Sequence, residues 1–117
     1  MTTLEENIKN IKLLQVFQNQ KEELKIKTQQ DLIISYNQGL FYIDSNLIST
    51  IKTMKEFEYE EFVLPDKNFN PIKISNISDF EEEVISKYTE VMNEYFIEYE
   101  KLKKTRKVIK IMETDDE

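Results

Sequence analysis

Residues 78–112 read SDFEEEVISKYTEVMNEYFIEYEKLKKTRKVIKIM and contain neither glycine nor proline. These two residues most often interrupt a helix, so the stretch predicts one long helix. Ser78 and Glu81 have the spacing of a capping box at its start. At about 1.5 Å per residue the helix would be on the order of 50 Å long. That is too long for a compact globule of 117 residues.

The apolar residues of this helix follow a heptad pattern, with alternating steps of four and three residues. The pattern runs through Val84, Tyr88, Val91, Tyr95, Leu102, Ile109 and Met112, with Ile85, Met92, Phe96 and Tyr99 beside it. Glu98 and Thr105 interrupt it. Such a stripe needs a partner surface along its whole length, and the shorter first helix can cover only part of it. The remainder of the helix either projects into solvent or is covered by another copy or a different protein. The predicted partner interface comprises Tyr88, Val91, Met92, Tyr95, Phe96, Tyr99 and Leu102.

The remainder of the chain predicts a first helix and two β-hairpins around a short helix. From Thr3 to about Gln30, apolar residues recur at steps of three and four. Residues 31–43 predict two strands joined at Asn37-Gln38-Gly39, because Gly39 is the only glycine. A helix capped by Asp44 or Ser45 follows, and residues 59–75 predict a second hairpin. The short helix would present one apolar face, formed by Leu47, Ile48, Ile51, Met54 and Phe57.

The predicted fold class is therefore helix-dominated α+β. A long N-terminal helix, a small antiparallel sheet with a short helix, and a long coiled-coil-like C-terminal helix follow one another. We expect a single domain over residues 1–112 and a disordered acidic tail at residues 113–117.

The composition excludes several kinds of chemistry. The chain has no histidine, no cysteine and no tryptophan, so zinc, haem, iron–sulfur and Cys–His chemistry are excluded. A single glycine cannot form a phosphate-binding loop. Adjacent acids such as Glu60 and Glu61 would point to opposite faces of a strand and could not act on one bond. We expect no cofactor, no metal site and no enzymatic activity.

One loop has part of a calcium-binding pattern. Asp66, Asn68 and Asn70 match its first, third and fifth positions, but Pro71 and Ile77 stand where glycine and glutamate are needed. The loop is interpreted as the connection of a hairpin.

Charge is segregated along the chain. Residues 56–100 hold thirteen acids and three lysines, a net charge of −10, whereas residues 101–110 hold six bases and no acid. The bases could contact nucleic acid or another anion. They could also complement the dipole of their helix, or meet the acidic end of a second long helix. The possible anion contact comprises Lys101, Lys103, Lys104, Arg106, Lys107 and Lys110.

The chain predicts neither export nor membrane insertion. Its first residues have no basic start followed by an apolar run, and no stretch approaches the roughly 18 apolar residues of a membrane span. We expect a cytoplasmic protein.

Three stretches resemble small proteins of large tailed bacteriophages. They are residues 43–48 (IDSNLI), residues 63–74 (VLPDKNFNPIKI) and a tyrosine-rich helix that ends in Lys103-Lys104-Thr105-Arg106. The resemblance implies a viral protein that acts in the host cytoplasm or within the virion. It brings no known site residues.

The function expected from these patterns is protein–protein interaction. The chain would be an oligomeric phage virion component, an assembly factor or an adaptor, with itself or another phage or host protein as partner. Two alternatives stay open. One is an accessory protein of nucleic-acid metabolism that binds through its basic helix end. The other is an acidic nucleic-acid mimic that inhibits a host protein, with Glu81, Glu82 and Glu83 as contacts.

Overall fold

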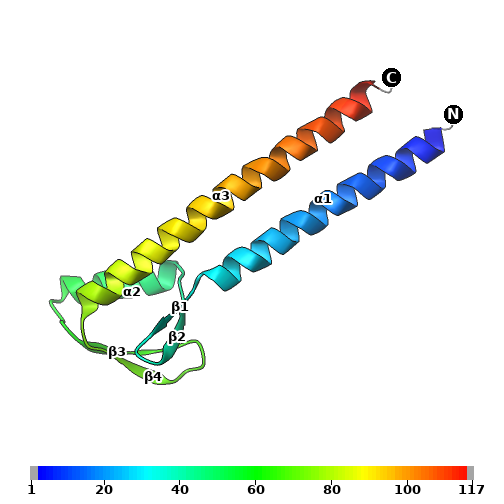
Figure 1. The fold of residues 1–117 in the computed structure, drawn as a ribbon. Coiled ribbons are helices and arrows are strands. Elements are labelled where there is room, and N and C mark those ends of the chain that lie inside the picture. The colour runs from blue at the N-terminus through cyan, green and yellow to red at the C-terminus, as the bar shows by residue number, and fades with distance from the viewer. Residues whose placement is uncertain (1–2, 116–117) are drawn as a thin grey trace. The chain divides into compact units, whose positions relative to one another are not determined.

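The fold is described from a computed structural model, which describes residues 3–115, with side chains up to residue 107. Figure 1 shows three helices and two β-hairpins. In chain order they are α1 (Thr3–Asp31), β1 (Ile33–Tyr36), β2 (Gly39–Tyr42), α2 (Ser45–Glu56), β3 (Phe62–Pro65), β4 (Pro71–Ile74) and α3 (Ile77–Asp115). The prediction of a helix-dominated α+β fold is confirmed.

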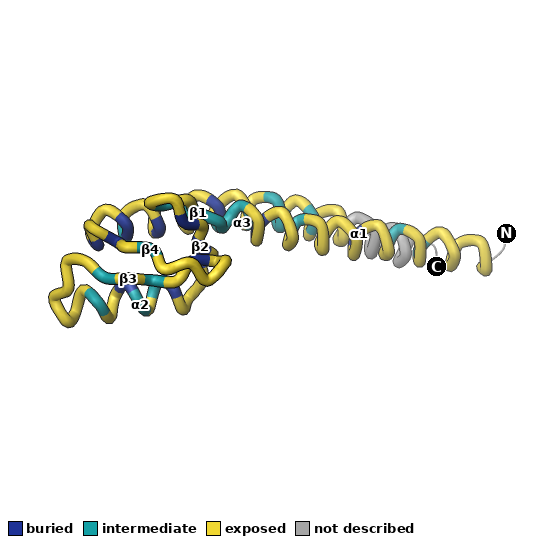
Figure 2. Tube along the Cα trace, turned by 90° about the horizontal axis from the view of Figure 1, so that it is seen from below, coloured by how far each residue is buried: buried dark blue, intermediate teal, exposed yellow. Residues whose placement is uncertain are grey.

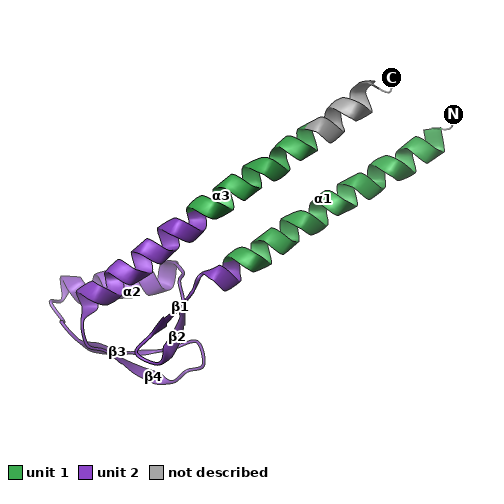
Figure 3. Cartoon of the chain, viewed as in Figure 1, with its two compact units in different colours: residues 1–28, 93–117 green, residues 29–92 purple. Residues whose placement is uncertain are grey.

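The contacts within the chain divide it into two compact units (Figure 3). Unit 1 comprises residues 1–28 and 93–117, and unit 2 comprises residues 29–92. Helices α1 and α3 each contribute residues to both units. The acidic tail predicted at residues 113–117 lies in part outside the described residues, and its disorder stays a prediction.

The turn of the first hairpin of unit 2 begins where the sequence predicted and is one residue shorter. Strands β1 and β2 pair antiparallel, with Tyr36 opposite Gly39 and Ile33 opposite Tyr42. The turn is therefore Asn37-Gln38, and both residues have positive φ, 51° and 71°. Such a two-residue turn matches the twist of a hairpin, and asparagine is tolerated in this conformation. The prediction that Gly39 forms the turn is wrong, because Gly39 is the first residue of β2 and its φ is not positive.

Gly39 is required instead by a close approach between the two hairpins. A Cβ atom at this position would lie 2.6 Å from Cγ1 of Ile72, which belongs to β4. Nearby, Nδ2 of Asn37 donates a hydrogen bond to the carbonyl of Lys73 at 2.7 Å. The turn and the start of β2 therefore pack against β4 without room for a side chain.

The short helix α2 is capped as the sequence predicted. The side chain of Asp44 accepts a hydrogen bond from the amide of Leu47 at 2.8 Å. Leu47 and Ile51 are buried, and Ile48 and Met54 pack beside them. Phe57 departs from the predicted apolar face, because it is the C-cap residue and is 71% exposed.

Strands β3 and β4 form the second predicted hairpin, with Leu64 opposite Ile72. Helix α3 then begins one residue before Ser78. The side chain of Asn76 accepts a hydrogen bond from the amide of Asp79 at 3.2 Å. The capping box predicted at Ser78 and Glu81 is therefore wrong. Asparagine is as good an N-cap as serine, and Glu81 instead pairs with Lys55 at 2.9 Å.

Asp66 joins the two hairpins through its buried carboxylate. One oxygen accepts hydrogen bonds from the amides of Asn68 and Asn70, at 3.0 and 2.9 Å, and the other accepts from the amide of Leu40 at 3.1 Å. The amide of Lys67 donates in turn to the carbonyl of Leu40 at 2.7 Å. The bond from Asn70 is the largest cause that lowers the pKa of Asp66 below its ordinary value of 3.8, and burial opposes it in part.

This pKa shift predicts a pH dependence of folding. Because the pKa is lowered in the folded state, the ionised carboxylate stabilises unit 2 fully above about pH 4, and this stabilisation is lost as the pH falls through the folded-state pKa. Asp66→Asn is expected to lower the free energy of unfolding at pH 7, with the difference from the natural chain shrinking in acid. Urea titrations between pH 3 and 7 measure this, with Glu60→Gln as an exposed control. A difference independent of pH would contradict the account.

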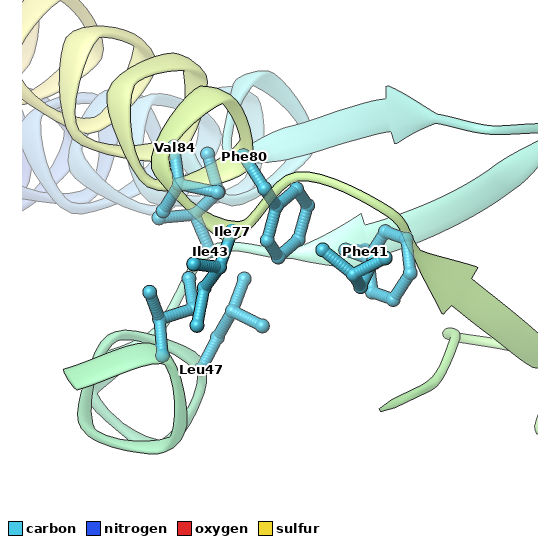
Figure 4. Packing of buried hydrophobic residues seen from close by; sticks show 8 residues of the cluster. Phe41, Ile43, Leu47, Ile77, Phe80 and Val84 are labelled. Atoms are coloured by element: carbon cyan, nitrogen blue, oxygen red, sulfur yellow. The ribbon is translucent and has the colours of Figure 1, made fainter. Parts of the chain in front are cut away.

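The core of unit 2 is apolar and continuous. Figure 4 shows Ile77, Phe80 and Val84 of α3 beside Leu47 of α2 and Phe41 of β2. Phe80 is fully buried, and its ring centroid lies 4.8 Å from that of Tyr36 and 5.3 Å from that of Phe41. The remaining buried members of this cluster are Ile43, Ile51 and Ile74. The start of α3 thus forms part of the core of unit 2.

Candidate interaction surface

In unit 1 the two long helices pair with each other inside one chain. Nζ of Lys27 lies 3.1 Å from Oε1 of Glu94. The ring of Phe17, ten residues before Lys27 on α1, lies 5.6 Å from the guanidinium carbon of Arg106. Arg106 follows Glu94 by twelve residues on α3. The contacts advance in opposite directions along the two helices, so the pair is antiparallel.

This helical pair buries few of its apolar side chains. Among the described residues of unit 1, Phe17 is the single buried large hydrophobic residue. Figure 2 shows yellow, exposed segments along most of α1. The exposed large hydrophobic residues of unit 1 are Leu4, Ile8, Ile11, Leu14, Val16 and Ile26 on α1 and Phe96 and Ile97 on α3. Two helices alone therefore leave most of their apolar surface in contact with water.

Four of the predicted interface residues belong to unit 1. Tyr95, Tyr99 and Leu102 are half-buried, and the rings of Tyr95 and Tyr99 lie 6.0 Å apart. Phe96 points away from this packing and is 64% exposed. Its neighbour Ile97 is 55% exposed. We call Phe96 and Ile97 the exposed apolar pair of α3.

The other three predicted interface residues belong to unit 2. Tyr88 is exposed and Met92 is half-buried. Val91 is only 5% exposed, so its side chain is available to no partner in this arrangement. The heptad pattern cannot distinguish a residue that packs within the chain from one that packs against a partner.

Sequence analysis did not include Ile97 or the apolar residues of α1 in the interface. Ile97 lies outside the heptad pattern, and only its exposure identifies it. Leu4, Ile8 and Ile11 lie within the apolar pattern predicted for the first helix. Their spacing of four and three residues was a signal of a separate stripe.

Most of the described cations of the basic segment have partners within the same chain. Lys101 pairs with Glu98 at 3.0 Å and Lys103 with Glu100 at 3.4 Å. Lys103 also lies 5.8 Å from the ring centroid of Tyr99, and Arg106 lies over Phe17. Lys104 and Lys107 are exposed, and the side chain of Lys110 lies outside the described residues. Exposed pairs of this kind contribute about 0–1 kcal/mol each, so they orient the cations without contributing much stability.

Each unit has a shallow hollow. In unit 1 it is lined by Gln18, Lys21, Glu22, Lys25 and Tyr95. In unit 2 it lies over the start of α2, beside Tyr42, Leu64 and Lys67. Neither lining includes a nucleophile paired with a base. Over the described residues, no three His, Cys, Asp or Glu side chains are grouped so that they could hold a metal ion.

The net charge of the chain resides in unit 2. Residues 29–92 contain 12 acids and 5 bases, a net charge of −7, whereas unit 1 contains 11 acids and 11 bases. Unit 1 therefore has no net charge that would oppose the approach of a second copy. No helix within residues 3–115 is long and apolar enough to span a bilayer.

Comparison with known proteins does not assign the chain to a family. Protein-family models, curated proteins and solved structures all give no match to this chain.

Proposed function

We propose that this chain is a non-enzymatic interaction protein that forms an oligomer through the helical pair of unit 1. One observation carries the proposal: the pair buries one large hydrophobic residue among those described and leaves eight exposed. Large apolar side chains left exposed in such number are typical of surfaces that contact other proteins. A partner that covers these side chains would complete the core that two helices cannot form alone.

Phe96 and Ile97 are expected to contribute most to such a contact on α3. They are adjacent and mostly exposed. Burial of a phenylalanine or isoleucine side chain contributes about 1.5–3 kcal/mol. Aromatic anchors often dominate the binding energy of an interface. Within unit 1, no other exposed aromatic side chain occurs among the described residues.

The biological setting is part of the same proposal. The resemblance to small phage proteins favours a virion component, an assembly factor or an adaptor that acts in an infected cell. Each of these roles needs a stable protein contact and no chemistry. The partner would be a second copy or another phage or host protein.

One alternative has an observation in its favour. The net charge of −7 on the 64 residues of unit 2 suits an inhibitor that mimics nucleic acid and binds a basic host protein. Direct nucleic-acid binding is less supported, because Lys101 and Lys103 pair with carboxylates of the same chain, which reduces the charge offered to phosphate.

The proposal predicts that Phe96→Ser combined with Ile97→Ser lowers the mass of the protein in solution. Serine removes the apolar surface and leaves the helix charge unchanged. Sedimentation velocity of the double variant should give a lower mass than that of the natural chain at the same concentration. Phe57→Ser combined with Val63→Ser is the matched control, since both residues are exposed in unit 2. Equal masses for the natural chain and the Phe96/Ile97 variant would refute the role of the exposed apolar pair in self-association.

A further inference from the structure

The first turns of α1 carry an apolar face that α3 does not cover. Leu4, Ile8 and Ile11 follow one another at steps of four and three residues, so they share one side of the helix. Ile8 precedes Phe17 by nine residues, which is about two and a half turns, and therefore lies on the opposite side. Phe17 is buried in unit 1, whereas Leu4 is 69% exposed and Ile8 and Ile11 are exposed as well. We call Leu4, Ile8 and Ile11 the rear face of α1.

We propose that the rear face of α1 binds the rear face of α1 in a second copy of this chain, with the two helices antiparallel. The inference rests on the proposed function and names the partner and the register of one contact. The twofold axis of the contact passes near Ile8. It places Leu4 beside Ile11 of the other copy and Ile8 beside Ile8 of the other copy.

Charge complementarity selects the second copy and the antiparallel direction. Glu5 and Lys12 are exposed and flank the rear face on one side, seven residues apart. In the antiparallel register Glu5 of each copy lies beside Lys12 of the other, which makes two ion pairs. A parallel pair would place equivalent flanking positions of the two copies on opposite sides of the contact, so Glu5 of one copy could not pair with Lys12 of the other.

Apolar complementarity points the same way. Six aliphatic side chains, three from each copy, would face one another in three layers about one turn or less apart. The polar residues Gln15, Gln18 and Glu22 follow on this side of the helix and end the apolar contact. The contact is therefore short, and the fraction of chains that associate through it rises with protein concentration.

Charge reversal tests the register directly. Glu5→Lys should bring two lysines together at each ion pair, and Lys12→Glu should bring two glutamates together. Each variant alone should therefore bind itself at least tenfold more weakly than the natural chain does. The double variant E5K/K12E should regain self-association. The two single variants, when mixed, should associate with each other. In the mixed pair each lysine of one variant lies beside a glutamate of the other. Single variants that associate as well as the natural chain would overturn the register.

Cysteine cross-linking tests whether the two α1 helices are antiparallel. The natural chain has no cysteine, so any disulfide joins the introduced residues. Ile8→Cys should form a disulfide dimer under mild oxidation, because the two residues meet at the axis. Leu4→Cys should not, because its two copies would lie about 12 Å apart along the axis, and cysteines whose Cα atoms are more than about 7 Å apart cannot bridge. Leu4→Cys mixed with Ile11→Cys should cross-link.

The outcomes separate this inference from the proposed function. If the natural chain is oligomeric but Leu4→Cys cross-links to itself as readily as Ile8→Cys does, the antiparallel contact is wrong and the proposed function stands. If the Phe96/Ile97 variant loses mass while the charge reversals change nothing, the inference alone fails. If the natural chain is monomeric at every concentration and Ile8→Cys does not cross-link, both the oligomer and the α1 contact are wrong.

Discussion

Replacement of Phe80 by alanine is expected to lower the free energy of unfolding of the protein by about 3–5 kcal/mol. The side chain of Phe80 is fully buried. It contacts Tyr36 of β1 and Phe41 of β2 through tilted and edge-on ring packing. It also joins the first turn of α3 to this sheet (Figure 4).

The loss is large because unit 2 is small. Its 64 residues contain eight buried members of one apolar cluster. A domain of ordinary stability has only about 5–15 kcal/mol in total. A cavity at Phe80 would therefore remove a large share of the stability, and the variant would be partly unfolded at physiological temperature.

Thermal and urea unfolding followed by circular dichroism measure this effect. Phe69→Ala is the matched control, because Phe69 is 83% exposed in the loop between β3 and β4 and should change stability by less than about 0.5 kcal/mol. If Phe80→Ala costs no more than Phe69→Ala, the packing described for unit 2 is wrong.

Replacement of Gly39 by alanine is the second large effect, with an expected loss of about 1–3 kcal/mol from overpacking. The added Cβ would lie 2.6 Å from Cγ1 and 3.0 Å from Cδ1 of Ile72. Since the φ of Gly39 is not positive, alanine is compatible with the backbone there. The cost therefore comes from the contact with Ile72 and not from backbone strain.

A double-mutant cycle separates the two causes. In a chain with Ile72→Ala, the two atoms that the new Cβ would meet most closely are absent, and the contact with Cε2 of Phe41 at 3.2 Å remains. Gly39→Ala should therefore cost much less in that chain. Urea unfolding of the four chains gives the coupling free energy. If Gly39→Ala costs as much with alanine at position 72 as with isoleucine, the close approach of the hairpins is not the reason for the glycine.

The sequence predicted every helix and strand because the local patterns agree with the fold. Apolar spacing located α1 and α3, and the alternation around residues 65–71 located the second hairpin. The errors concern single residues whose role depends on distant neighbours. Gly39 is explained by Ile72, and Ile72 lies 33 positions away in the sequence. Asn76 replaces Ser78 as the cap because the approach of the chain from β4 sets where α3 begins.

The candidate surface was predictable only in outline. The heptad pattern of α3 identifies the apolar residues but not which of them the chain itself covers. Buried Val91 and exposed Phe96 were therefore both included in the predicted interface. The basic segment suggested a contact with anions. The pairs of Lys101 and Lys103 with glutamates one turn away were readable from the spacing, whereas the position of Arg106 over Phe17 depends on the pairing of two helices distant in sequence.

The apolar surface of unit 1 is proposed to mediate self-association of the chain. The mass in solution, measured by light scattering behind a sizing column at low and at high salt, tests it most directly. We expect one defined oligomer at both salt concentrations, because burial of apolar surface is not screened by ions. A monomer at both salt concentrations, up to the highest protein concentration reached, would contradict it.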